Sequence, residues 1–546
     1  MFKHLIFISS IALLGLSSCG IKSEKADLII HNAQSINALV PGNELAQAIA
    51  IKDGKIIAIG AEREILNAYR SDQSLDAKKG FVYPGFHDAH CHFLGYATNL
   101  FRADLKGTYS ANEVVERLKN FRKDNHNIGW ISGRGYDQTL WETGAPHKTI
   151  LDKHFPDIPI TIQRIDGHAV WANSKALELA GFDANTQIEG GILERDEQGL
   201  TGILLEMAGE AMLELIPAPT KDEKKQALMR AQSSCFASGL THLTDAGLPW
   251  EDIRLLQEMK REGELKIGLN IMVQNKRPDI DSLIASGGIH EPNFRVKSLK
   301  VYGDGSLGSR SACLKEHYAD KPAHFGITVI DQDSLEGLAR EAKENGYQLN
   351  IHSIGDSTSS MVLSAYENVL EANNDLRWRI EHSQVLDRAD HERLRKLRII
   401  PSVQPTHATS DRRWATQRVG DHRTDRLYAY KSLLAINGIL PLGTDFPVEG
   451  IAPLNTFQSA VFRRTNPEDE KYLPEEGLQK NEALLGLTIF PAISGFLEAE
   501  IGTLELGKQG DIVILNRDLA ILDESDFTNL HIMHTIKGGE VVYSNK

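Results

Sequence analysis

The amino-acid sequence predicts an α/β fold, a (β/α)8 TIM-like barrel, with a small β-sandwich formed from both chain ends and a large insertion after the first barrel strand. Three observations predict it. The 546 residues are 41% hydrophobic and 25% charged, the ordinary balance of a globular protein with a full core. Both chain ends show short alternating strand patterns. The long middle alternates strand-like runs with helical runs, for which an open doubly wound sheet is the alternative.

The charge and cysteine content exclude several classes of protein. The 60 Lys and Arg residues against 74 Asp and Glu residues give a net charge of −14, and no basic cluster is present that could bind phosphates. We therefore expect no nucleic-acid partner. The four cysteines are too few and too scattered for a disulfide scaffold.

The chain begins with the pattern of an export signal. Residues 1–18 contain Lys3 and then an apolar run too short to span a bilayer, which predicts a signal peptide. This segment and Cys19 resemble the lipobox of bacterial lipoproteins, so Cys19 is the expected lipidation site; an ordinary cleaved signal is the alternative. Residues 19–25 would form a polar tether. We therefore expect an exported protein, lipid-anchored on the periplasmic or extracellular side of a bacterial membrane.

Both ends of the remaining chain are predicted as strands with tight turns. In the first segment, residues 26–82, the part Ala26–Gly60 alternates with the period of half-buried strands, and its Asp53-Gly54 pair is a strong hairpin signal. Residues 500–546 repeat the pattern with a Gly-Gly turn. The two segments are therefore predicted to form one composite β-sandwich.

Residues 83–499 are predicted to form the barrel. Eight apolar runs indicate strands, and most stretches between them have helical periodicity and stop at a glycine. The runs are Phe81–His92, Gly239–Thr244, Ile267–Val273, Leu299–Gly303, Tyr347–His352, Trp378–His382, Ile399–Gln404 and Leu440–Asp445. Eight such units favour a closed barrel, whose active site lies at the carboxyl ends of its strands.

The insertion, residues 95–238, separates the first two barrel strands. It has strand-like pieces of its own, and the pattern Thr220-x-x-Glu223 predicts a capping box at the start of a helix. Because a segment inserted after a barrel strand leaves on the catalytic face, we expect the insertion to cover the active site.

Two histidines of the first barrel strand are candidate metal ligands. His90 and His92 are two residues apart, so their imidazoles share one face of the strand and can hold one divalent metal. A lone pair of this kind is weak evidence, since chance produces it often. The context strengthens it, because three later strands end in polar residues where an apolar strand should continue: His352, His382 and Asp445. Four histidines and a carboxylate at the strand ends of one barrel suit zinc or another divalent first-row metal.

Lys300 lies within an apolar strand. Burial should lower its pKa towards the neutral amine, which can take up CO₂ and become a carbamate that bridges two metals. An equally weighted alternative is a lysine that reaches out from the strand end.

These segments together resemble the amidohydrolase superfamily, and within it amidohydrolase family 3, the group that includes N-substituted formamide deformylase-like proteins. The resemblance is carried, in order, by PGFHDAHCH, LKVYGDGSLGSR, NIHSIGD, RIEHSQ and LGTDFPV. It implies a first metal bound by His90 and His92 and touched by Asp445, which would also be the general base. It implies a second metal bound by His352 and His382, with a carbamylated Lys300 as the bridge. Whether one metal or two are bound stays open.

Five further residues are weaker candidates for contacts with substrate: Tyr136, Trp141, His168, Asp304 and Arg310. The two aromatic residues could line an apolar pocket, although a core position is the default for such side chains. His168 could reach the site from the insertion or serve the structure of the insertion itself. Asp304 and Arg310 lie in the loop after Lys300, whose glycine pattern is embedded in the barrel alternation and does not indicate dinucleotide binding.

The sequence therefore predicts a metal-dependent hydrolase of a non-peptide C–N bond in a small molecule: an amide, formamide, cyclic imide or urea-like group. It would act through a metal-activated hydroxide, with Asp445 as general base and one or two divalent metals, Zn²⁺ first, as cofactor. The alternatives are an N-acyl amino acid deacetylase, a non-catalytic ligand-binding lipoprotein with a vestigial metal site, and a lyase or isomerase. The sequence leaves open whether the chain forms a homo-oligomer.

Overall fold

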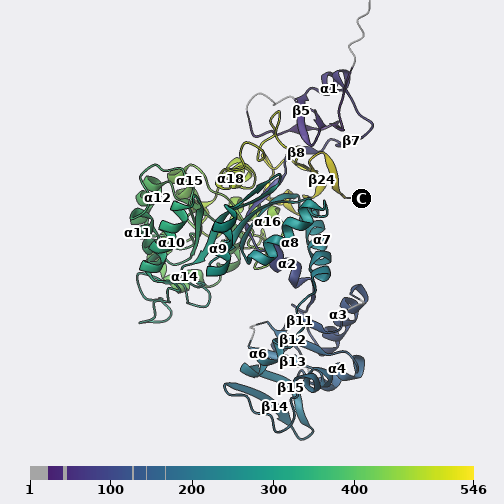
Figure 1. Ribbon diagram of the computed structural model, residues 1–546, viewed down its shortest axis with the longest axis vertical. Coiled ribbons are helices and arrows are strands. Elements are labelled where there is room, and N and C mark those ends of the chain that lie inside the picture. The colour runs from purple at the N-terminus through teal and green to yellow at the C-terminus, as the bar shows by residue number, and fades with distance from the viewer. Residues whose placement is uncertain (1–22, 41–45, 126–127, 143, 166–167, 546) are drawn as a thin grey trace, which may run out of the picture.

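Figure 1 shows the computed structural model of the protein, which describes residues 23–40, 46–125, 128–142, 144–165 and 168–545. The barrel lies in the middle, the strands of both chain ends lie on one side of it, and a separate lobe lies on the other. The predicted signal peptide and Cys19 fall outside the described residues. Among the helices that are described, none has the length and apolar character needed to cross a membrane.

The barrel sheet contains seven parallel strands in one path. In spatial order they are β9 (Phe86–Cys91), β16 (Leu240–Leu248), β17 (Gly268–Gln274), β19 (Phe294–Tyr302), β20 (Gln348–Ser353), β21 (Arg379–His382) and β22 (Ile400–Ser402). A short strand, β18 (Ile289–Glu291), pairs antiparallel with β19. Each predicted run before the last overlaps one of the seven strands, so the predicted α/β barrel is confirmed.

The eighth predicted run, Leu440–Asp445, closes the barrel without forming a regular strand. Leu442 makes a parallel bridge with Val403, just beyond β22, and its carbonyl accepts from the N–H of Ala89 in β9 at 3.2 Å. The segment then turns at Asp445, whose φ of +60° lies in the left-handed region and is incompatible with an extended strand. The gap between β22 and β9 is therefore filled by a short, bent segment.

Helices follow the barrel strands and cover the barrel from outside (Figure 1). They are α2 (Phe93–Asn99), α7 (Lys221–Ala237), α8 (Trp250–Arg261), α9 (Arg277–Ser286), α10 (Gln332–Glu344), α11 (Asp356–Glu367), α12 (His391–Leu397), α13 (Pro405–Asp411), α14 (Ala415–Val419), α15 (Tyr430–Asn437), α16 (Pro453–Phe462), α17 (Lys480–Gly486) and α18 (Ile489–Ser494). The predicted capping box at Thr220 and Glu223 opens α7. Short 3₁₀ helices lie at Gln138–Leu140, Arg388–Asp390, Asp421–Arg426, Pro474–Glu476 and Glu524–Asn529.

Two sheets come from the chain ends. One holds β2 (Leu28–His31), β4 (Ala48–Lys52), β5 (Lys55–Gly60) and β7 (Ser74–Asp76), and the other β3 (Ser35–Ile36), β8 (Phe81–Pro84), β23 (Ile512–Leu515), β24 (Ile532–Lys537) and β25 (Glu540–Ser544). β1 (Glu24–Lys25), α1 (Glu62–Ala68) and β6 (Tyr69–Arg70) lie beside the first sheet. Apolar side chains of both sheets share one buried cluster. The domain limits drawn from the sequence stay predictions.

Residues 102–213 form the lobe. Its sheet contains β10 (Arg102–Asp104), β11 (Ile131–Tyr136), β12 (Ile160–Arg164), β13 (Ala169–Ala172), β15 (Gly199–Glu206) and β14 (Gly191–Asp196), with helices α3 (Ala111–Asp124), α4 (Lys148–His154), α5 (Ser174–Ala180) and α6 (Met207–Leu213). Its two apolar clusters contain residues of the predicted insertion alone. The last part of that insertion differs, because α7 contributes Leu228 and Cys235 to the barrel's own core.

Figure 1 shows the lobe on the side of the barrel where α2 leads into it and α7 leads out, apart from the body of the barrel. The expectation that the insertion covers the active site therefore stays a prediction.

Candidate metal centre

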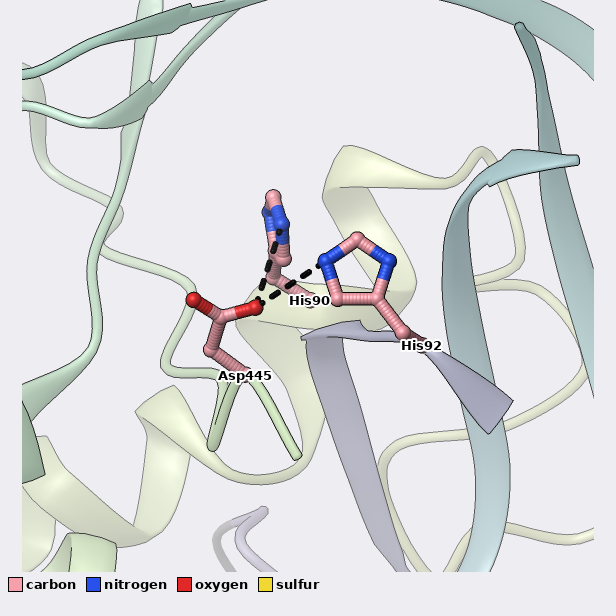
Figure 2. A group of neighbouring side chains, drawn as sticks. All are labelled: His90, His92 and Asp445. Carbon is pink, nitrogen blue, oxygen red and sulfur yellow. Dashed lines mark ion pairs between the residues drawn. The ribbon is translucent and has the colours of Figure 1, made fainter. Parts of the chain in front are cut away.

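The centre is built where β9 ends next to the bent segment that closes the barrel. His90 lies in β9 and His92 directly follows this strand, and Figure 2 shows both imidazoles turned towards the carboxylate of Asp445. Asp445 Oδ1 lies 3.2 Å from His92 Nε2 and 3.7 Å from His90 Nε2. Three side chains from two distant parts of the sequence therefore converge on one point.

The backbone explains why Asp445 can lie so close to β9. Its N–H donates to the carbonyl of His90 at 2.8 Å, and the hydroxyl of the preceding residue, Thr444, donates to Asp88 Oδ2 at 2.6 Å. At Gly443, a Cβ atom would lie 2.7 Å from the His90 backbone nitrogen, so a residue with a side chain would push the segment away. The glycine is therefore required by close approach.

Buried partners orient the imidazoles of the centre. His90 Nδ1 donates to Glu381, which is fully buried and also paired with Arg379, while His382 Nδ1 donates to Gln404 Oε1 at 2.7 Å. A proton fixed on Nδ1 leaves Nε2 with a free lone pair, the usual arrangement of a metal-binding histidine and its outer partner. Although burial opposes it, the charge of Arg379 helps to lower the pKa of Glu381 to about 2.

Electrostatics keep the donor atoms in the state that a metal requires. Burial, and then the charge of Lys300, lowers the pKa of His90 to about 4, so its imidazole is neutral. Burial would raise the pKa of Asp445, but the neighbouring imidazoles, that of His92 first, hold it well below its usual range. Neutral imidazoles and an ionised carboxylate are ligands for a divalent metal.

Lys300 reaches the same cluster from β19. Its Nζ lies 3.2 Å from His90 Nε2, and burial lowers the pKa of the amine to about 8. The predicted burial of this lysine is thus observed, and the alternative of a lysine that reaches out to solvent does not describe it. Its carbamylation stays a prediction.

His352 lies at the edge of the cluster. Its ring centroid is 4.5 Å from that of His382, but its Nε2 faces the carbonyl of Gly305 at 3.2 Å and Asp304 Oδ1 at 3.6 Å. The structure brings the ring to the centre without turning its Nε2 atom towards Asp445.

Two residues of the site were not found from the sequence: Glu381 and His407. Glu381 lies in the RIEHSQ segment, directly before the predicted ligand His382. His407 lies in α13, just after β22, with its Nε2 3.6 Å from Asp445 Oδ2. His407 does not stand at a strand end, because it follows β22 by five residues and lies within a helix. The histidine in the segment PSVQPTHATSD was its only sequence signal.

The remaining predicted residues lie elsewhere or have structural partners. Tyr136 and Trp141 are buried in the lobe core against Trp171, and Trp141 Nε1 donates to the carbonyl of Thr108 at 3.1 Å. Both residues therefore occupy core positions, the default for aromatic side chains, because the lobe has its own core to fill. His168 is exposed in the lobe, where it faces Glu206 at 3.1 Å.

The two candidates in the loop after Lys300 are also engaged. Asp304 is buried and accepts from the backbone N–H groups of Cys313, Ile354 and Gly355. Arg310 pairs with Asp320 at 2.9 Å. The first shapes the loop beside His352, and the second ties two parts of the loop together. Their contacts with substrate stay predictions.

The donor set fits a divalent metal. Among the described residues, two groups place one ligand atom of each member within 4.8 Å of the others: His90, His92 and Asp445, and His382, His407 and Asp445. Asp445 Oδ1 and His407 Nε2 are buried without a hydrogen-bond partner. Such atoms are costly to bury unpaired, and a bound cation would satisfy both.

A parallel α/β barrel with imidazoles and a carboxylate gathered at its strand ends defines the class of metal-dependent hydrolases. The model of the amidohydrolase family matches residues 73–543, and the chain belongs to that family, within amidohydrolase family 3. The resemblance drawn from the sequence is confirmed at this level. The protein is therefore an enzyme, a hydrolase that acts on carbon–nitrogen bonds other than peptide bonds, with a divalent metal as its cofactor.

Individual relatives cover nearly the whole chain. The protein LONG AFTER FAR-RED 3 of Arabidopsis thaliana is 30% identical over 95% of this chain and 92% of its own length. N-substituted formamide deformylase of Arthrobacter pascens is 26% identical over 95% of this chain and 99% of its own. The crystal structure of an uncharacterized metal-dependent hydrolase from Pyrococcus horikoshii is 28% identical and covers 91% of this chain and 99% of its own, with a TM-score of 0.75.

Proposed function

We propose that the protein hydrolyses an amide-type C–N bond of a small molecule, an amide, formamide, cyclic imide or urea-like group, at a zinc centre. The observation that carries the proposal is the position of Asp445, whose ionised carboxylate lies within 3.2 Å of one imidazole and 3.7 Å of another and keeps Oδ1 unpaired. A structural carboxylate would use both oxygens for hydrogen bonds. A carboxylate kept free among imidazoles suits proton transfer at a metal site.

The residues that would hold the metal are those that converge on Asp445. His90 and His92 would bind one ion with it, and His382 supports a second. When bound, a divalent metal supplies an acidified water, with a pKa of about 7, and polarises the carbonyl of the substrate. Lys300, next to His90, is proposed as the carbamylated bridge: its neutral amine adds to CO₂, forms the N–C bond and releases one proton.

The chain's own groups would carry the proton from water to the departing nitrogen. Asp445 is ionised, so it can accept a proton from the attacking water and then give that proton to the nitrogen as the C–N bond breaks. Glu381 and Gln404 would hold the imidazoles in a single orientation during these steps. Both are buried, which keeps their positions fixed.

The surroundings of the centre support a substrate with an apolar substituent. Tyr302 is 49% exposed, although its ring lies 5.4 Å from that of His352 at the end of β19. Val448, three residues beyond Asp445, is 65% exposed. Exposed apolar side chains beside a polar site favour a ligand with an apolar part. The similarity to N-substituted formamide deformylase supports a substituted formamide as the first candidate.

A panel of C–N substrates tests the proposal. Zinc-loaded protein would be given N-substituted formamides, cyclic imides and N-acetyl amino acids, and formate, ring-opened acid or acetate would be measured. We expect turnover of one of the first two groups. Acetate released from N-acetyl amino acids alone would favour the deacetylase instead, and no turnover of any group would remove the proposed substrate class.

The Asp445→Asn variant is the control for mechanism. We expect it to lose about 10²- to 10⁴-fold in kcat, the usual contribution of a general acid–base group, while elemental mass spectrometry still finds metal. The imidazoles of the first site are intact in this variant, which is why metal should remain. Activity near that of the wild type would remove Asp445 as the base.

Export and anchoring are proposed from the sequence alone. Cys19 would carry the lipid, and the rest of the chain would lie outside the membrane. A Cys19→Ala variant should move from the membrane fraction to the soluble fraction of the producing bacterium. Retention of this variant in membranes would contradict the lipid anchor.

A further inference from the structure

We propose that one face of the lobe sheet binds a carboxylate of the substrate and so completes the substrate site outside the metal centre. The proposal rests on the proposed function and deepens it, because it names a second group that the small-molecule substrate carries besides its C–N bond. The binding surface is a row of five polar side chains, here called the polar row, at five neighbouring strands of that sheet: Arg102, Arg134, Gln163, His168 and Glu206.

The register of the lobe sheet places the first part of the row on one face. Ser132 of β11 pairs with Arg102 of β10, and Arg134 follows Ser132 by two residues, so both arginines project from the same face. Arg134 pairs with Gln163 of β12, and Gln163 pairs with Val170 of β13. Three adjacent strands therefore present polar side chains side by side.

His168 and Glu206 continue the row on the same face. His168 precedes Val170 by two residues, and Glu206 follows Leu204, the partner of Val170 in β15, by two residues. The N–H of Glu206 donates to the carbonyl of His168 at 3.1 Å, and His168 Nδ1 lies 3.1 Å from Glu206 Oε2. The row thus ends in a paired imidazole and carboxylate.

The apolar half of this face is covered by helices, whereas the polar row is exposed. Val170 and Leu204 pack with Leu177 of α5 and Met212 of α6 in one buried cluster. Both arginines of the row and His168 are exposed. The row lies where the parallel strands β10, β11 and β12 end, and the carboxyl ends of parallel strands are where open α/β sheets bind ligands.

The two arginines lack a neutralising partner. Their guanidinium groups make no ion pair or hydrogen bond with another residue in the described part of the chain. Asp104, which the register places beside Arg134, accepts from the N–H of Lys106 at 3.1 Å instead. Burial, and then the charge of Arg134, lowers the pKa of Arg102. Because like charges on adjacent strands repel each other, an anion bound between them would be stabilised.

A carboxylate suits this pair of arginines. Its two oxygens can accept from two guanidinium groups, and hydrogen bonds between ionised partners are short and strong. The other end of the row holds the carboxylate of Glu206, which disfavours a ligand with more than one negative charge. The row therefore selects a small molecule with a single carboxylate.

The backbone of Glu206 supports a binding role for its end of the row. Its φ of +50° and ψ of −129° lie in a region that is costly for a residue with a side chain. Although Glu206 precedes α6, its side chain makes no capping hydrogen bond to that helix. Strain of this kind gathers at ligand sites, where it holds a side chain in one place.

The arginine end of the row lies next to the barrel. α2 begins directly after His92 and has 7 residues, so it is about 10 Å long, and Arg102 lies just beyond it. Phe101, between them, packs against the barrel core, and its carbonyl accepts from the hydroxyl of Ser132 at 3.5 Å. Among the labelled strands of the lobe, Figure 1 shows β11 nearest to the barrel and β14 farthest from it. A turn of the lobe about this junction would carry the arginines towards the metal centre.

The test compares two formamides that differ in one carboxylate: N-formyl-phenylalanine and N-formyl-2-phenylethylamine. Zinc-loaded, full-length wild type would be compared with Arg102→Gln, Arg134→Gln and a matched control, Lys153→Gln, which removes a positive charge from an exposed residue of α4 in the same lobe. We expect the wild type and the control to prefer the acid by about 10- to 100-fold in kcat/KM, through KM, as hydrogen bonds to a charged group would give. Each arginine variant should lose most of this preference and keep the wild-type rate with the uncharged formamide.

Other outcomes overturn the proposal. Equal kcat/KM for the two formamides in the wild type does so, and so does a preference for the acid that survives in both arginine variants. The uncharged formamide guards against a general structural effect, together with circular dichroism. If Arg134→Gln slows both formamides equally, the residue serves the structure of the lobe and the carboxylate site is rejected.

A binding measurement separates this proposal from the proposed function. Phenylacetate, which has a carboxylate and no C–N bond, would be titrated into the zinc-loaded proteins in a calorimeter. Its Kd should rise by about 10-fold or more in Arg134→Gln and stay at the wild-type value in Lys153→Gln. That result with no turnover of any C–N substrate would support the carboxylate site and reject the function. Turnover of a C–N substrate with the same Kd for phenylacetate in Arg134→Gln as in the wild type would do the reverse.

Discussion

The metal centre of the barrel and the aromatic core of the lobe both bury polar side-chain atoms. They differ in whether the unpaired atoms lie together. In the centre, Asp445 Oδ1 and His407 Nε2 are unpaired and belong to donor groups that share one carboxylate. In the lobe, Trp141 and Trp130 donate to Thr108 and Thr161. The unpaired nitrogen of Trp171 lies in an apolar cluster. Convergence of unpaired donors, rather than burial or residue type, distinguishes a site from a core.

The largest expected effect that tests this contrast is in the lobe. Trp171→Ala removes a fully buried ring, and we expect it to cost about 3 to 5 kcal/mol of unfolding free energy. Because the lobe has its own apolar clusters, metal content should stay at the wild-type value. Limited proteolysis of the lobe and urea unfolding would measure the first effect, with Trp171→Phe as the milder control. Loss of metal in the alanine variant would show that the two regions are not separate.

A smaller effect is expected behind the imidazoles. Glu381→Gln keeps the shape of the side chain but weakens the hold on His90 Nδ1, so the apparent affinity for zinc should fall by about 10- to 100-fold. Chelator competition measures it. The exposed Glu392→Gln in α12 is the control and should bind zinc as the wild type does. Unchanged affinity in Glu381→Gln would mean that the orientation of His90 is set by packing alone.

The smallest effect is expected at Arg310. Its pair with Asp320 is partly exposed, so Arg310→Gln should change the unfolding free energy by no more than about 1 kcal/mol. KM should also stay the same, since the guanidinium is turned to Asp320. A rise in KM with unchanged stability would restore this residue as a contact for substrate, as the sequence suggested.

Much of the barrel was predictable because apolar strands and glycine-ended helices leave a periodic trace. The bend at the end of the eighth run could not be predicted. The left-handed backbone at Asp445 depends on the hydrogen bond from its N–H to His90 and on the contact of the Thr444 side chain with Asp88. These contacts join residues more than 350 positions apart. Periodicity carries no information about them.

The sequence predicted the residues of the first donor group. His90, His92 and Asp445 meet because residues of parallel strand ends must meet at one face of a barrel. His407 was missed because it lies within α13, beyond the end of β22, and not at a strand end. The role of Tyr136 and Trp141 could not be decided either, because an aromatic residue that lines a pocket and one that fills a core look alike in a sequence.

The way in which the chain enters and leaves the lobe has a consequence for how such enzymes can diversify. α2, which precedes the lobe, and α7, which follows it, share the barrel's core through Phe93, Ala97 and Leu228. The chain therefore enters and leaves the lobe at neighbouring positions, so residues 102–213 are attached to the barrel at one place. A segment attached in this way can be lengthened, shortened or exchanged between relatives while every metal-binding residue proposed above keeps its place.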